Sequence, residues 1–205
     1  MVQVRSTVAA ITLIVAVILG QAGPAQAATP DAAKGFIQDL GERALGMLRD
    51  EVPAAERNRE FRHLFTAGFD VPRIARFVLG RFWRRASDAQ KREYVSLFEE
   101  YIVDTYAARF GTYSGESFQV GTATRKSRKE TLVTSNIQRP DAPSIRVDWR
   151  VLDRGDKLKI VDVVVEGVSM AITHRSEFAS VINNNGGRID ALLERLRAQI
   201  AKTTR

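Results

Sequence analysis

The apolar residues in the first half of the chain recur at the spacing of amphipathic helices. The clearest helix is expected within residues 87–111. Ser87 and Gln90 have the spacing of a capping box at its start, and Gly111 suits its end. Its apolar face is expected to contain Tyr94, Leu97, Phe98, Tyr101, Ile102 and Tyr106.

Three more helices are expected before it. A short one begins at Asp70, which can cap its first turn, and ends at Gly80. The other two are expected at residues 29–50 and 53–68, each with a proline near its start. The pattern therefore predicts a helical region over residues 29–110.

From about residue 117 the apolar period falls to two, which is typical of half-buried strands. Short turns between these segments predict an antiparallel meander. In the last strand we expect Leu158 and Ile160 on one face and Val163 and Val165 on the other, with a bulge or close backbone approach at Gly167. The four strands are expected at residues 118–124, 129–139, 145–151 and 158–166.

Helical spacing returns after residue 172. Thr173 is expected to cap a helix, and a second helix is expected from about Arg188. The sheet would then span residues 117–172 and the last helices residues 173–203. The predicted fold class is α+β, with helices packed on a curved four-stranded antiparallel sheet.

Residues 1–27 have the three parts of a secretory signal peptide: Arg5, an apolar run over residues 8–19, and small residues before a cleavage site after Ala27. We therefore expect residues 28–205 to form one exported domain. The chain has 31 basic and 24 acidic residues, and this excess favours anionic partners. Export excludes nucleic acid as the partner.

The sequence offers little catalytic chemistry. It has no cysteine and only two histidines, His63 and His174, so no metal site or cofactor is expected. It contains no nucleophile elbow, phosphate loop or dinucleotide fingerprint. For His174 a capping or surface position is favoured over a role as a general base. We expect no enzyme.

Three carboxylates on neighbouring strands, Asp148, Asp162 and Glu166, leave two interpretations open. One of them, buried in an apolar cavity, could act as a base of raised pKa. The favoured alternative is that they pair with basic residues on the same or adjacent strands. Those basic residues are Arg146, Arg150 and Lys159.

Many aromatic and aliphatic side chains lie on elements expected to face one another. From the residues alone, a filled core is the favoured interpretation, because apolar stripes usually pack against each other. The alternative is the lining of an apolar cavity. The candidates are Phe82, Trp83, Phe98, Tyr101, Tyr106, Val147, Trp149, Val163, Val165, Val168 and Met170.

A series of short motifs in the chain resembles the family of Mla-type periplasmic phospholipid-binding proteins, also known as toluene-tolerance or auxiliary ABC-transport components. The resemblance spans nearly the whole chain after residue 27, in the same order. Residues 165–182 are also similar to a subgroup associated with hopanoid gene clusters. The matching positions are Asp70, Ile74, Ala75, Leu79, Gly80, Trp83, Ser87 and Gln90, and residues 113–116, 159–163, 166–169 and 175–178.

This resemblance implies a half-rolled sheet wrapped by helices around an apolar cavity, an architecture like that of nuclear transport factor. It implies a monomeric periplasmic carrier of phospholipid between the inner and outer membranes. The implied partners are an inner-membrane ABC transporter with a lipid-binding domain and an outer-membrane lipoprotein complex. Three alternatives stay open: a hopanoid carrier, a small enzyme with a buried carboxylate, and an interaction protein without a ligand.

Two short basic groups are candidates for a footprint on a membrane or an acidic partner. The alternative is that these residues form an ordinary solvated surface. The residues are Arg81, Arg84, Arg85, Arg125, Lys126 and Arg128.

Overall fold

The computed structural model describes residues 28–49, 53–107, 115–155 and 157–203, and it has the expected α+β architecture. The signal-peptide prediction and the expected helix end at Gly111 lie outside these residues. The helices are α1 (Pro30–Arg49), α2 (Ala54–Gly68), α3 (Val71–Leu79), the 3-10 turn η1 (Gly80–Arg84), α4 (Asp88–Ala107), α5 (Met170–Asn184) and α6 (Ile189–Thr203). The strands are β1 (Ser117–Arg125), β2 (Glu130–Arg139), β3 (Ala142–Asp153), β4 (Leu158–Val165) and β5 (Val168–Ser169).

The helix boundaries around α3 and α4 follow from capping residues. The Asp70 carboxylate accepts a hydrogen bond from the Arg73 N–H at 3.3 Å, and Gly80 ends α3 with a φ of 57°. At the start of α4 the Ser87 N–H donates to Gln90 Oε1 at 3.0 Å, and the Gln90 N–H donates to Ser87 Oγ at 3.2 Å. The predicted capping box is therefore present with both of its hydrogen bonds.

The sheet is an antiparallel meander in the order β1-β2-β3-β4-β5. The sequence predicted four of these strands and missed the two-residue β5. Glu166 and Gly167, with φ values of 47° and 80°, make the tight turn between β4 and β5. Gly167 therefore lies in a hairpin turn, where a bulge or a close backbone approach was expected.

A register shift between Arg150 and Val151 reverses the expected alternation within β4. Ile160 pairs with Val151, whereas Val163 pairs with Trp149. Ile160 and Val163 therefore lie on the same face of the sheet, contrary to the sequence expectation, because an extra residue in β4 changes the parity of the alternation.

Helix α5 begins earlier than predicted. Its N-cap is Ser169, whose hydroxyl accepts a hydrogen bond from the Ile172 N–H at 3.1 Å. Thr173 lies one turn inside the helix and donates its hydroxyl to the Ser169 carbonyl at 2.9 Å. The sheet therefore ends at Ser169, and the last helices begin at Met170.

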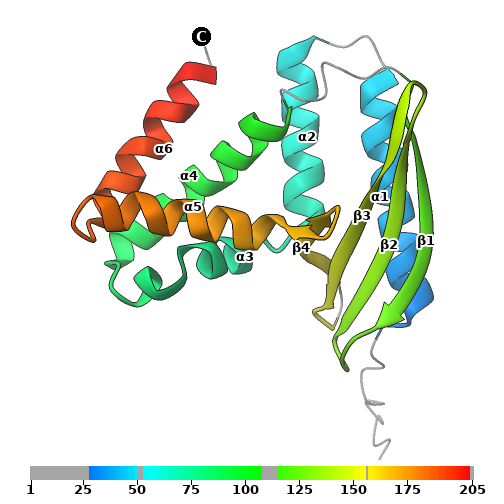
Figure 1. Cartoon of the computed structure of the whole chain (residues 1–205), viewed down its shortest axis with the longest axis horizontal. Helices are drawn as coiled ribbons and strands as arrows, with labels where there is room; N and C mark the ends of the chain where they lie inside the picture. The colour runs from blue at the N-terminus through cyan, green and yellow to red at the C-terminus, as the bar shows by residue number, and fades with distance from the viewer. Residues whose placement is uncertain (1–27, 50–52, 108–114, 156, 204–205) are drawn as a thin grey trace, which may run out of the picture.

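The buried apolar residues form two clusters. The larger lies among α2 to α6, and the smaller lies between α1 and the sheet. Figure 1 shows the sheet with α1 at one side of the molecule and α3 to α6 at the other. Phe69, in the junction between α2 and α3, packs against both clusters.

Polar contacts fix this junction to β4. The Asp70 N–H donates to the Ile160 carbonyl at 2.9 Å. Lys159 Nζ donates to the last carbonyls of α2, those of Thr66 at 3.1 Å and Ala67 at 2.6 Å. Within the described ranges, no helix is long and apolar enough to cross a membrane.

Candidate functional site

Four of the predicted cavity residues lie together on one face of the sheet, which we call the inner face. The register pairs Val147 with Val165 and Trp149 with Val163, so the side chains of all four point the same way. The Trp149 indole N–H donates to Ser135 Oγ at 2.8 Å, and the Ser135 hydroxyl donates to the Val147 carbonyl at 3.0 Å. The polar atoms on this face are thus satisfied internally.

Helix α1 closes one end of the inner face. Ala33 and Ile37 of this helix pack with Val133, Val151 and Ile160, and none of the five is more than 1% exposed. Farther along β3 and β4, Val147 is buried, whereas Trp149, Val163 and Val165 stay only half-buried. This stretch is an apolar surface that the described chain covers incompletely.

A second apolar surface is formed by α4 and the first turns of α5. The Tyr106 hydroxyl lies 3.8 Å from Met170 Sδ and 3.3 Å from His174 Nε2, and the Tyr101 ring meets the His174 ring edge-on at 5.9 Å. Met170 directly follows Ser169, which pairs with Val164 of β4, so this surface adjoins the sheet.

His174 does not take the capping or surface position that the sequence favoured. It is 9% exposed and its Nδ1 lies 3.2 Å from Glu177 Oε2. The reason is that His174 shares the inward side of α5 with Phe178, four residues later, and both rings pack against Tyr101 of α4.

Two predicted cavity residues are ordinary core. Phe82 and Phe98 are 2% and 1% exposed within the helical cluster, and Phe98 meets Phe178 edge-on at 6.3 Å between ring centroids. For these two residues the structure matches the filled-core alternative.

One other candidate lies away from the sheet. The Trp83 ring lies beside two cations, with Arg76 Cζ at 6.0 Å and Lys91 Nζ at 5.9 Å from its centroid. Val168 pairs with Val165 and therefore points to the inner face, where it is 53% exposed on the edge strand β5. The structure therefore brings together eight of the eleven candidates, five on the inner face and Tyr101, Tyr106 and Met170 on the adjoining helices.

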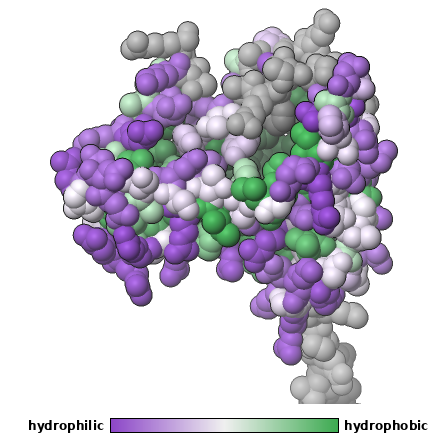
Figure 2. Space-filling model, viewed as in Figure 1, coloured by the Kyte–Doolittle hydropathy of each residue, from purple (hydrophilic) through white to green (hydrophobic). Residues whose placement is uncertain are grey.

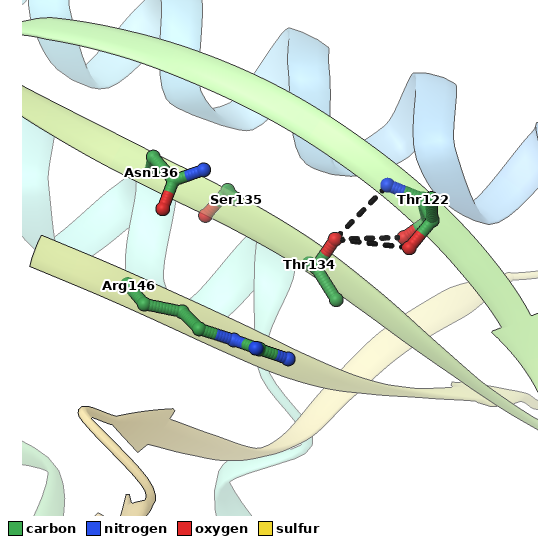
Figure 3. A pocket seen from close by; sticks show the side chains of 5 residues that line it. All are labelled: Thr122, Thr134, Ser135, Asn136 and Arg146. Carbon is green, nitrogen blue, oxygen red and sulfur yellow. Dashed lines mark hydrogen bonds between the residues drawn. The ribbon is translucent and has the colours of Figure 1, made fainter.

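A pocket of about 230 Å³ lies on the other face of the sheet, and it is polar (Figure 3). Thr134 Oγ1 accepts a hydrogen bond from the Thr122 N–H at 2.9 Å and lies 3.2 Å from Thr122 Oγ1. Such a surface suits water better than acyl chains. The pocket is lined by Thr122, Thr134, Ser135, Asn136 and Arg146.

A second pocket, of about 200 Å³, lies between the sheet, α3 and the start of α5. It combines charged and apolar side chains. Its lining consists of Arg73, Ile74, Phe77, Glu130, Arg150, Val161, Asp162 and Ala171.

Both carboxylates in this second pocket, Asp162 and Glu130, have structural partners. The Asp162 side chain is 4% exposed and accepts hydrogen bonds from the Ser169 hydroxyl at 2.7 Å and the Ala171 N–H at 3.1 Å. Arg150 lies 3.9 Å away and donates to Glu130 at 2.8 Å, a hydrogen bond that raises the pKa of Arg150. A carboxylate engaged in this way anchors the start of α5.

The other two carboxylates are also paired. Asp148 accepts two hydrogen bonds from the Arg146 guanidinium, at 3.0 and 3.2 Å, and Glu166 accepts one from the Arg146 N–H. Lys159 is not one of their partners, because it caps α2. Within the described residues, no group of three or more potential metal ligands occurs.

The six basic candidates fall into two groups at different places in the fold. Arg81 donates to Asn183 Oδ1 at 2.9 Å, and Arg85 lies against Gly187 in the turn between α5 and α6. Arg125, in the hairpin between β1 and β2, donates to the Ala28 carbonyl at 2.7 Å. In Figure 1 this hairpin lies at the sheet end of the molecule, far from η1, so the six do not form one footprint.

Sequence reasoning missed two polar residues of the site. Ser135 comes two residues after Val133 and therefore points to the inner face, where the Trp149 N–H needs an acceptor. His174 comes four residues before Phe178, a spacing that puts both on one side of a helix. Both signals were present in the sequence, but each depends on knowing which face is buried.

Comparisons with known proteins agree with this architecture. The toluene tolerance protein ttg2D of Pseudomonas putida is 20% identical over 122 residues, which are 60% of this chain and 57% of that protein. The match therefore spans less than two thirds of that relative.

A solved structure shares the fold. It is the phospholipid-binding protein from Ralstonia solanacearum in complex with a phospholipid, with a TM-score of 0.73 and 19% sequence identity over 84% of this chain and 99% of that one. The sequence pattern of the MlaC protein family matches residues 38–198, which are most of the chain. The protein belongs to the MlaC family.

Proposed function

We propose that this protein is a periplasmic carrier that holds the acyl chains of a phospholipid against the inner face of its sheet. The observation that carries the proposal is the half-buried apolar stretch formed by Trp149, Val163 and Val165 beside Tyr106 and Met170. The likeness to a phospholipid-bound structure supports it.

The energetics favour binding by the tails of the lipid. Each methylene removed from water contributes about 0.8 kcal/mol, so ten methylenes contribute about 8 kcal/mol. The two arginines of β3 are already engaged, Arg146 with Asp148 and Arg150 with Glu130. The headgroup can then stay in water, and the site needs no charged clamp.

The proposal includes transport. A soluble domain that shields acyl chains can move a lipid across the aqueous space between the inner and outer membranes. The proposed partners are an inner-membrane ABC transporter complex with a lipid-binding domain and an outer-membrane lipoprotein complex. A polycyclic lipid of hopanoid type is the alternative cargo, which the same apolar surface would accept. The proposed role is binding and transfer without catalysis.

The test is to purify the protein without its first 27 residues under native conditions and identify the extracted lipids by mass spectrometry. The proposal expects near-stoichiometric phospholipid; hopanoid at that level would support a carrier of the alternative cargo. A lipid-free protein that stays empty after incubation with liposomes would refute both.

A matched pair of variants locates the cargo. Trp149→Arg puts a charge on the inner face and is expected to abolish lipid retention. Asn136→Arg puts the same charge on the exposed outer face of the same sheet and should retain lipid. Wild-type loading by a folded Trp149→Arg protein would show that the lipid binds elsewhere.

A further inference from the structure

Among the described residues, the large apolar side chains left most exposed are Phe77, Val168 and Ile172, at 43%, 53% and 57%. Val168 pairs with Val165 and so belongs to the inner face of the sheet. The other two come from α3 and the first turn of α5, and we call Phe77 and Ile172 the apolar patch.

The two side chains of the patch lie on adjoining helices. Helices α3 and α5 pack together, and Arg175 Cζ of α5 lies 5.0 Å from the centroid of the Phe77 ring. Ile172 lies one turn before Arg175 and therefore on the same side of α5. In Figure 2 the visible face carries its apolar surface along the junction between the helices and the sheet, with hydrophilic surface on both sides.

Arginines border the patch without carboxylate partners. Residues 71–84 contain Arg73, Arg76, Arg81 and Arg84 and no acidic residue. Within the described chain, neither these four nor Arg175 forms a salt bridge. This side of the molecule therefore offers uncompensated guanidinium groups next to exposed apolar side chains.

We propose that the apolar patch and the arginines beside it dock the protein on the surface of a bilayer with anionic headgroups. Guanidinium groups bind phosphate oxygens in a bidentate manner, and aromatic and aliphatic side chains insert at the boundary between headgroups and acyl chains. The inference rests on the proposed function, because a lipid carrier exchanges its cargo at a membrane.

A bilayer fits these observations better than an acidic protein does. The patch is two separate side chains on two helices, and the arginines are spread along α3, η1 and α5. Lipid phosphates move laterally and can match any such spacing, whereas a protein partner must hold its carboxylates at fixed complementary positions.

The test is flotation of the protein with vesicles of phosphatidylethanolamine and phosphatidylglycerol, compared with vesicles of phosphatidylcholine alone. Wild-type protein is expected to float with the anionic vesicles and to be released by salt. Phe77→Ser with Ile172→Ser should weaken binding on the order of tenfold. Arg73→Glu with Arg175→Glu should weaken it by at least about twentyfold, because each arginine near an anionic surface contributes about fivefold.

The matched control is Lys126→Glu with Arg128→Glu, which makes the same change in charge at the hairpin between β1 and β2. This variant should bind like the wild type. Thermal unfolding checks that each variant is folded, and the single variant Ile172→Ser replaces the double one if the latter unfolds.

The outcomes separate docking from cargo binding. Lipid-loaded wild-type protein that fails to float, or equal flotation by the patch variants and the control, would overturn the docking surface while leaving the carrier in place. Flotation that depends on the patch in a protein that never retains lipid would support docking and refute the carrier. Binding to an immobilised acidic peptide with no flotation would assign the surface to a protein partner and overturn the proposal.

Discussion

Replacing Asp162 by alanine tests whether its carboxylate serves structure or chemistry. The side chain is 4% exposed and accepts hydrogen bonds from the Ser169 hydroxyl and the Ala171 N–H at the start of α5. Ser169 is the last residue of β5 and Ala171 is the second residue of α5, so both donors lie where the strand passes into the helix. Removing the acceptor leaves the buried Ala171 N–H without its partner.

The expected loss of stability can be worked out from these contacts. A hydrogen bond to a charged group contributes about 1.5 to 3 kcal/mol, but the Ser169 hydroxyl can turn to another acceptor. The ion pair with Arg150 is 3.9 Å long and the Arg150 side chain is 43% exposed, so it adds less than about 1 kcal/mol. The free energy of unfolding should fall by about 3 kcal/mol, a decrease in Tm of about 6 to 12 °C for a domain of this size.

Urea unfolding followed by circular dichroism measures this change. The matched control is Asp148→Ala on the neighbouring strand, whose partner Arg146 has a side chain 61% exposed, and it should lose less than about 1 kcal/mol. Lipid loading should be unchanged in both variants. An Asp162→Ala protein of wild-type stability would refute the structural role, and a folded variant that had lost a catalytic activity of the wild type would establish the enzyme alternative.

Three other substitutions test the packing around the site. Tyr94→Phe should raise the free energy of unfolding by about 1 kcal/mol, because the buried Tyr94 hydroxyl has no hydrogen-bond partner among the described residues. Burial also raises the pKa of Tyr94, so above about pH 10 the tyrosine ionises in the unfolded chain before it ionises in the folded protein. The free energy of unfolding of the wild type should therefore fall as the pH rises above about 10. The variant should lose less stability in the same pH series of urea unfolding. Ser87→Ala should cost about 1 kcal/mol in the same assay by removing the capping box, and an unchanged midpoint would contradict that role. Gly167→Ala should cost about 1 kcal/mol from its φ of 80° alone, since no atom lies within 4 Å of the added Cβ; a larger loss would point to a close contact.

Local signals in the sequence were sufficient for much of the fold. Helix ends are set by hydrogen bonds between residues three or four positions apart, as at Asp70, Ser87 and Gly80. Contacts between such near neighbours can be predicted from the sequence. The strands of the meander follow from alternation and turn residues in the same way. The sequence indicated an irregularity at Gly167 but did not predict the hairpin turn there, because the two residues of β5 are too short to show a period.

The candidate site was less predictable because it depends on which surfaces meet. Phe82 and Trp149 are both large apolar residues in amphipathic segments, yet one is core and the other lies on the half-buried sheet. The extra residue near Val161 put Ile160 and Val163 on the same face of the sheet, and no local sequence signal predicts this extra residue. Face assignment is a tertiary property, so a pattern read along one strand cannot fix it.

The contacts between β4 and the junction of α2 with α3 constrain the order in which this chain can fold. Helices α1 to α4 are local structures, but the junction between α2 and α3 is completed only when Ile160 supplies its carbonyl and Lys159 its ammonium group, about ninety residues later. This junction therefore lacks its partners until β4 has been synthesised. If the chain crosses a membrane before that point, the junction is completed only after translocation, so the two apolar clusters join through Phe69 only then.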